Sequence, residues 1–181
     1  DVYKVAGKVK GIGDFLLEMK HRCFEPYDAL TVGEAMFVKE EILPQFIGDQ
    51  GYFSTIFAFE PCHAYRKGKN YMDYDWPQPF DDWKKETFHN QKIIEKAGFE
   101  ANIIENHDQP RSVSRFGNDS DEYREISAKM LATCIHMMQG TPYVYQGEEL
   151  GMTNCPFNTL DNFRDLESIN AFHELTEQGK M

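Results

Sequence analysis

Seven consecutive residues, Glu105 to Arg111, combine side chains suited to acid–base and polyol-binding chemistry. Between the two end residues lie the imidazole of His107 and the carboxylate of Asp108, and the run directly follows the apolar segment 102–104. These groups can accept or donate hydrogen bonds to hydroxyls, and a positioned carboxylate or imidazole can transfer a proton. A solvated loop has no need for this combination. The segment therefore predicts a binding or catalytic cleft at the end of a strand.

A second carboxylate, Glu34, stands well upstream, where the short apolar run 29–32 stops. A lone Glu at a strand end often serves a helix cap or an ion pair, and a lone His-Asp pair is often structural. Glu34, His107 and Asp108 could also be metal ligands, but one His without a partner His at helical spacing counts against that interpretation. The residue types alone leave these alternatives open.

Composition narrows the class of protein. The 181 residues are 41% hydrophobic and 27% charged, with a formal net charge of −11. This balance argues against nucleic acid and anionic membranes as partners, and no apolar run is long enough to span a bilayer. The four cysteines form no CxxC pair, and no secretory signal is visible. We expect a cytoplasmic protein with reduced thiols, no metal site and no cofactor.

Strand-like and helix-like runs alternate along the chain, which indicates βα units and a parallel sheet. The predicted strands are residues 29–32, 53–59, 102–104 and 141–145. The predicted helices are residues 9–24, 35–43, 81–97, 120–140 and 161–177. Glu34 and Asp108 then both follow strand ends, the edge at which parallel α/β proteins bind ligands. Four strands fit half of an eight-stranded barrel or a small open sheet.

The helix predicted for residues 120–140 carries an apolar stripe at spacings of three or four residues. Such spacing places side chains on one face of a helix. We therefore expect the stripe to be core rather than a cofactor site. Its members are Tyr123, Ile126, Met130, Cys134 and Met137.

Three segments in order resemble the signatures of one family. They are Thr31 to Ala35 (TVGEA), Glu105 to Arg111 (ENHDQPR) and Gly140 to Met152 (GTPYVYQGEELGM), and residues 114–117 add to the likeness. The chain resembles the α-amylase family of glycoside hydrolases, in its oligo-1,6-glucosidase and α-glucosidase branch. The resemblance implies an α/β fold, a partial (β/α)₈ TIM barrel containing strands five to eight with their helices. Residues 1–181 would be the second half of that catalytic domain, with no complete second domain.

The resemblance also implies roles for particular residues. Glu34 matches the general acid/base, and Asp108 matches the carboxylate that binds sugar hydroxyls in the transition state. His107, Arg111 and Phe59 match substrate-binding positions. The family's nucleophile belongs to a motif of the form aromatic-Arg-x-Asp-Val, which does not occur in these 181 residues. We therefore expect the nucleophile and strands one to four to be supplied from outside this chain.

The implied activity is that of a retaining α-glucosidase acting on small gluco-oligosaccharides, with this chain inactive by itself. A non-catalytic sugar-binding or scaffold relative, or a transglycosylating or isomerising member, is the alternative. The expected partners are the substrate and the missing N-terminal half of the barrel. Open strand edges also predict self-association. Glu148 and Glu149 are expected to be structural, bonded to loop amides.

Overall fold

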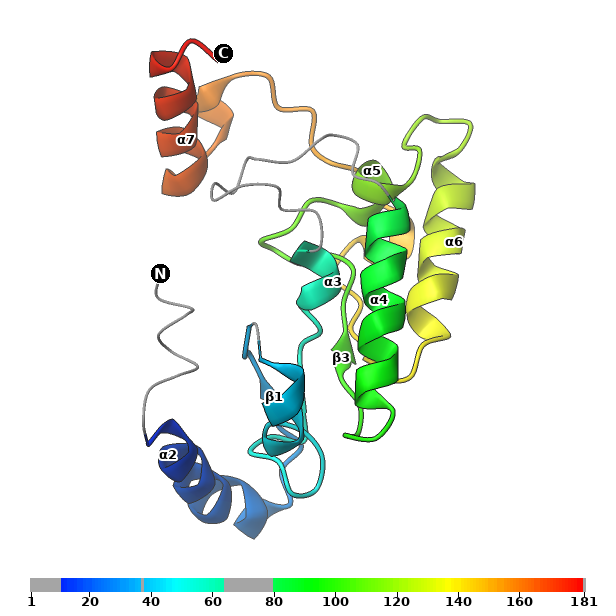
Figure 1. The fold of residues 1–181 in the computed structure, drawn as a ribbon. Helices are drawn as coiled ribbons and strands as arrows, with labels where there is room; N and C mark the ends of the chain where they lie inside the picture. Colours follow the sequence, from blue (N-terminus) through cyan, green and yellow to red (C-terminus); the bar gives the residue numbers. More distant parts are fainter. Residues whose placement is uncertain (1–10, 37, 64–79, 181) are drawn as a thin grey trace.

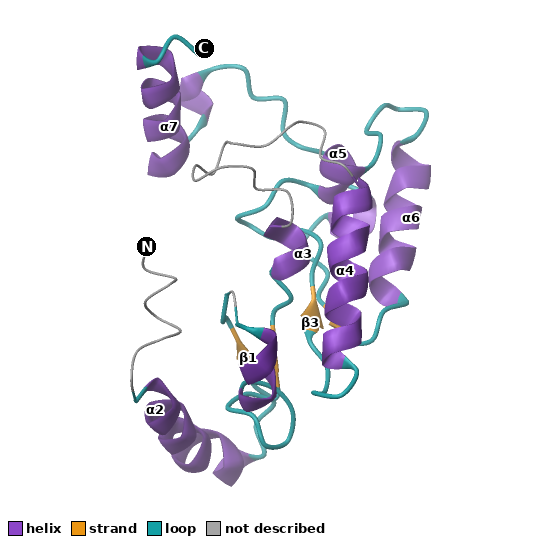
Figure 2. Cartoon of the chain, viewed as in Figure 1, coloured by secondary structure: helices purple, strands orange, loops and turns teal. Residues whose placement is uncertain are grey.

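A computed structural model describes residues 11–36, 38–63 and 80–180 of the chain. It contains four two-residue strands, which are β1 (Val32–Gly33), β2 (Thr55–Ile56), β3 (Ala101–Asn102) and β4 (Thr141–Pro142). Each lies inside or beside a segment predicted to be a strand, but the ladders are shorter than the apolar runs. Figure 2 shows how much of the chain around the strands is loop.

All four strands point in the same direction. β1 pairs in parallel with β2, and β3 pairs in parallel with β4. A parallel bridge between Phe57 and Ala101 joins the two pairs, supported by a 3.1 Å hydrogen bond from the Ala58 amide to the Ala101 carbonyl. The strands therefore follow one another in sequence order, as in an arc of a parallel barrel.

Along with the strands, the described residues form six α-helices and five shorter helical segments. The α-helices are α2 (Ile12–Met19), α3 (Glu60–His63), α4 (Phe80–Ile94), α5 (Ser112–Phe116), α6 (Arg124–His136) and α7 (Leu166–Glu177). The shorter segments are a π-helix, Lys20–Phe24, and 3₁₀ helices at Glu25–Tyr27, Glu40–Gln45, Glu148–Leu150 and Leu160–Asn162. In Figure 1, α4 lies next to β3 and α6 lies next to α4, whereas α7 lies apart from both helices. Within the described ranges, no helix is long and apolar enough to cross a bilayer.

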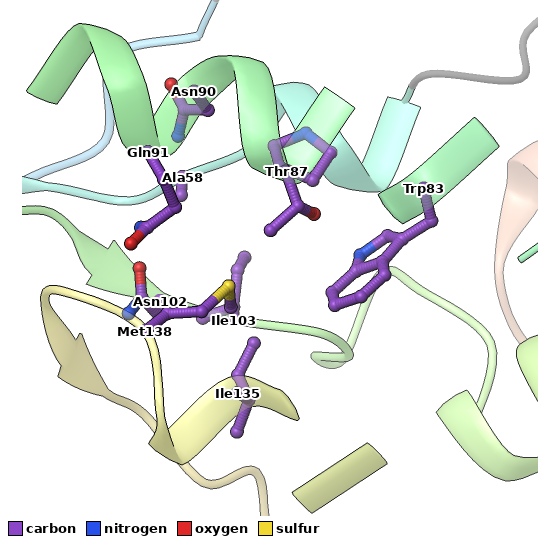
Figure 3. A pocket seen from close by; sticks show the side chains of 10 residues that line it. Ala58, Trp83, Thr87, Asn90, Gln91, Asn102, Ile103, Ile135 and Met138 are labelled. Atoms are coloured by element: carbon purple, nitrogen blue, oxygen red, sulfur yellow. The ribbon is translucent and has the colours of Figure 1, made fainter. Parts of the chain in front are cut away.

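The core beside β3 is formed where α4 and α6 meet. Trp83 of α4 packs with Leu131 and Ile135 of α6 and with Phe116 of α5. Figure 3 shows Trp83 and Thr87 facing Ile103 and Ile135 across a small internal pocket. A second cluster joins the 3₁₀ helix Glu40–Gln45 to β2 and α4, and its buried members include Leu43, Ile47, Ile56 and Ile94. These contacts hold α4 against the middle of the sheet.

Local signals set several helix ends. The Asp165 side chain accepts a 2.8 Å hydrogen bond from the Ser168 amide and so caps α7, which begins at Leu166 rather than near residue 161 as predicted. α4 carries acidic residues in its first turn and ends at Ile94. Gly98, predicted to terminate it, has φ of +138°, and its amide bonds the Ile94 carbonyl. Glycine suits this backbone conformation because it has no Cβ.

The helix predicted for residues 35–43 was wrong. A 3₁₀ helix at Glu40–Gln45 takes its place, with Pro44 inside it. Proline has no amide hydrogen, and its ring clashes with the carbonyl four residues earlier. Pro44 therefore prevents an α-helix from continuing through residues 40–45.

The apolar stripe predicted to be core on α6 was also wrong. Four of its members are exposed, at 45% for Tyr123, 65% for Ile126, 39% for Met130 and 80% for Met137. The buried positions are Leu131 and Ile135 on another face, and of the stripe only Cys134 packs against that core. Apolar residues lie on both faces of α6, so their spacing alone could not show which face is buried.

Candidate active site

Glu34 and the loop after β3 lie at the same edge of the sheet. Glu34 directly follows Gly33, the last residue of β1, and is exposed. The His107–Asp108 pair follows β3 at the same end, because β1 and β3 belong to one parallel array joined by the Phe57–Ala101 bridge. The loops at the carboxyl ends of parallel strands are the usual ligand-binding elements of α/β barrels.

The His107–Asp108 pair projects from a turn organised by Asn106. The Asn106 side-chain oxygen accepts a 2.8 Å hydrogen bond from the Asp108 amide, a turn in which an Asn side chain replaces a backbone acceptor. The two side chains are 75% and 65% exposed, and the His107 Nε2 lies 3.4 Å from Asp108 Oδ2. A carboxylate and an imidazole presented in this way can bind neighbouring hydroxyls of one ring.

Arg111 occupies the far side of the same loop, where it links two strand ends. Its Nη1 donates to Glu105 Oε1 at 2.7 Å and to the Gln146 carbonyl at 2.8 Å. The guanidinium carbon lies 4.9 Å from the centre of the Tyr145 ring, a cation–π distance. The loop after β3 is thus tied to the segment after β4. Substrate binding by Arg111 stays a prediction.

Phe59 lies in the core. Its side chain is 4% exposed and packs with Cys62 and Ile103, with Tyr143 and Phe57 against the same cluster. Its ring surface is used for packing between the ends of β2, β3 and β4. Its predicted contact with a sugar stays a prediction.

The expectation of structural roles for Glu148 and Glu149 is confirmed. Glu148 Oε2 accepts a 3.0 Å hydrogen bond from the Tyr145 amide, and Glu149 Oε2 accepts a 2.8 Å bond from the Gly147 amide. Burial raises the pKa of Glu148 to about 7, and the nearby charge of Glu105 acts in the same direction. Both residues shape the turn after β4.

Glu105 begins the predicted segment 105–111, but sequence analysis assigned no role to it. Its carboxylate, 1% exposed, accepts hydrogen bonds from Arg111 and from the Ser112 amide. The available signal was an ionisable residue directly after an apolar strand, six positions before an arginine. A buried carboxylate requires a partner, and arginine provides a strong one.

The described residues contain no group of three or more His, Cys, Asp or Glu that could hold a metal ion. The metal-hydrolase alternative therefore gains no support from the part of the chain that the structure describes. All four cysteines are free thiols, and Cys62 is buried.

A parallel array with helices packed on it, and polar loops at its carboxyl edge, defines an α/β protein of the barrel or open-sheet class. Comparison with known families gives the particular family. The model of the α-amylase catalytic domain matches residues 8–180, and the chain belongs to that family.

Individual relatives agree with this assignment. The chain is 42% identical over 165 residues to a probable oligo-1,6-glucosidase 2 of Bacillus subtilis, covering 90% of the chain and 29% of the relative. The solved trehalose-6-phosphate hydrolase of Bacillus licheniformis is 40% identical with a TM-score of 0.80, over 95% of this chain and 31% of that one. The solved trehalulose synthase of Pseudomonas mesoacidophila is 34% identical with a TM-score of 0.84, over 96% and 31%. The chain thus spans about three-tenths of the length of the relatives it matches.

Proposed function

We propose that this chain is the second half of the catalytic barrel of a retaining α-glucosidase, containing strands five to eight. The observation that carries the proposal is the parallel order of the four strands, which brings Glu34 and Asp108 to one edge. The substrate class is small gluco-oligosaccharides, and the relative named oligo-1,6-glucosidase supports that choice.

Retention of configuration needs two carboxyl groups, one as nucleophile and one as acid and then base, about 5–5.5 Å apart. Glu34 takes the second role. It protonates the departing oxygen and later deprotonates the water that hydrolyses the glycosyl-enzyme intermediate. The nucleophile comes from the part of the barrel that this chain does not contain, so the 181 residues alone are inactive.

Asp108 and His107 bind hydroxyls of the ring that reacts. The ring flattens as positive charge develops, and a carboxylate held beside it binds more strongly at that moment. Binding that strengthens only in the transition state raises kcat rather than lowering KM. Asp108 therefore stabilises the transition state, while His107 orients the ring.

The decisive experiment uses Glu34→Gln in the complete parent protein. An acid catalyst matters less when the leaving group departs easily, so the loss of kcat should be large for isomaltose and much smaller for a dinitrophenyl α-glucoside. Glu41→Gln, the same chemical change at another exposed position nearby, should leave both rates unchanged. Equal losses on both substrates would reject the acid/base assignment.

An isomerising or transglycosylating reaction is the second candidate, favoured by the likeness to a trehalulose synthase. It uses the same intermediate, but a sugar hydroxyl attacks in place of water. Product analysis of sucrose and isomaltose reactions separates the two. Glucose release without rearranged disaccharide supports the hydrolase.

A further inference from the structure

Glu105 holds the base of the loop that carries His107 and Asp108. Its Oε1 accepts a 2.7 Å hydrogen bond from Arg111 Nη1, and its Oε2 accepts a 2.6 Å bond from the Ser112 amide. Both donors come after the loop, and Glu105 comes before it. One carboxylate therefore closes residues 106–110 into a short loop whose two ends cannot separate.

The loop has a second attachment beside the pair, because Arg115 Nη1 donates a 2.8 Å hydrogen bond to Gln109 Oε1. Within it, Asn106 organises the turn through the amide of Asp108. The His107 and Asp108 side chains are mostly exposed, at 75% and 65%, so packing does little to fix them. Their position relative to the sheet therefore depends on how the loop is anchored, both at Gln109 and at its two ends.

The anchor extends to the next strand. Arg111 also donates from Nη1 to the Gln146 carbonyl and stacks on the Tyr145 ring, while its amide donates to Asn154 Oδ1 at 2.8 Å. Removal of the Glu105 charge would deprive the guanidinium, itself 20% exposed, of the carboxylate that it binds at 2.7 Å. The Arg111 side chain, which joins the loop after β3 to the segment after β4, would then be held less firmly.

A buried ion pair of this kind is poorly explained as a source of stability. Desolvation of two charges offsets much of their attraction, and apolar replacements are often equally stable. A displacement of about 1 Å at a catalytic group can cost about a hundredfold in rate. We therefore expect this ion pair to contribute more to the position of the loop than to the free energy of unfolding.

We propose that Glu105 is a positioning residue that acts through Asp108, holding the transition-state carboxylate at its working position. The proposal rests on the function proposed above for Asp108. It makes no claim that Glu105 touches the substrate.

The experiment compares Glu105→Gln with Glu100→Gln in the complete parent protein. Both glutamates are 1% exposed, and they flank opposite ends of β3, so the control replaces an equally buried carboxyl group that does not bind Arg111. After titration of active enzyme with a covalent glycosidase inactivator, Glu105→Gln should lower kcat on an aryl α-glucoside about 10–100-fold with KM changed less than about threefold. Glu100→Gln should keep kcat within about twofold.

A double-mutant cycle separates positioning from a general structural defect. In an Asp108→Asn background, Glu105→Gln should cause little further loss, because the group it positions is already disabled. The same fractional loss in both backgrounds would overturn the proposal. Glu105→Asp, which keeps the charge but shortens the reach, should show an intermediate kcat and provides a folded variant if the glutamine protein is unstable.

A readout without activity keeps this proposal distinct from the proposed function. Amide hydrogen exchange in residues 106–109 should be faster in Glu105→Gln than in the parent, and unchanged in Glu100→Gln. If the parent cleaves no α-glucoside, the proposed function fails while faster exchange still supports the anchoring role. Unchanged exchange together with unchanged kcat would show that Glu105 positions nothing.

Discussion

One buried glutamate lies before β3 and another lies after it, and the two bind partners of different charge. Glu100, before the strand, binds a neutral partner, Asn90 of α4, with 2.6 Å between Asn90 Nδ2 and Glu100 Oε2. Glu105, after the strand, binds the cationic Arg111. Burial raises the pKa of Glu100 to about 7, with the hydrogen bond from Asn90 opposing the shift. One end fastens a helix to the sheet, and the other anchors the loop proposed to be catalytic.

This contrast fits the division of labour in α/β barrels, where the carboxyl edge serves chemistry and the amino edge serves stability. Changes at the carboxyl end of β3 should therefore alter rate with little effect on folding. Changes at the amino end should do the reverse. Three substitutions test that separation.

Asp108→Asn should have the largest effect, on rate. Loss of a group that binds developing charge in the transition state costs about 10²–10³ in kcat. The side chain is 65% exposed, so the melting temperature should stay within about 1 °C of the parent's. Steady-state kinetics and calorimetry on the parent protein measure the two quantities. A cooperative loss of stability would remove the contrast between the two ends.

Gly140→Ala should have the next largest effect, on stability. The residue has φ of +137°, and an added Cβ would lie 2.5 Å from Asn102 Nδ2 and 2.6 Å from the Glu100 carbonyl oxygen. Left-handed strain and overpacking together predict a loss of about 3–5 kcal/mol in the free energy of unfolding. Urea denaturation measures it. Gly179→Ala, with positive φ but no atom within 4 Å of the added Cβ, separates backbone strain from the clash.

Glu100→Gln should have the smallest effect, and only above about pH 4.5. The folded protein binds a proton at Glu100 up to a pKa of about 7, whereas the unfolded chain releases it near 4.5. Parent stability should therefore fall as pH rises from about 4.5 to 7, by about 3 kcal/mol, and then level off. The neutral glutamine should remove this decline. Parallel pH–stability curves for the two proteins would show that Glu100 does not titrate this way.

Much of the local structure was predictable. The four strand positions and the helices after β2 and β3 were predicted, and so was the position of Glu34 and Asp108 after strand ends, because burial periodicity and turn residues act over a few positions. The roles of Glu148 and Glu149 at loop amides were also correct. The exposed stripe of α6 and the 3₁₀ segment containing Pro44 were not.

The sequence by itself determined the family, the order of the elements and the residue types at the carboxyl edge, because these depend on neighbouring residues and on ordered motifs. Only the tertiary structure decided which face of α6 is buried and which acid binds Arg111. A helix with apolar residues on two faces has no local preference, so its partner, Trp83, selects the face. The partner of a charge likewise depends on which segments fold together, and here the loop after β3 closes on Glu105.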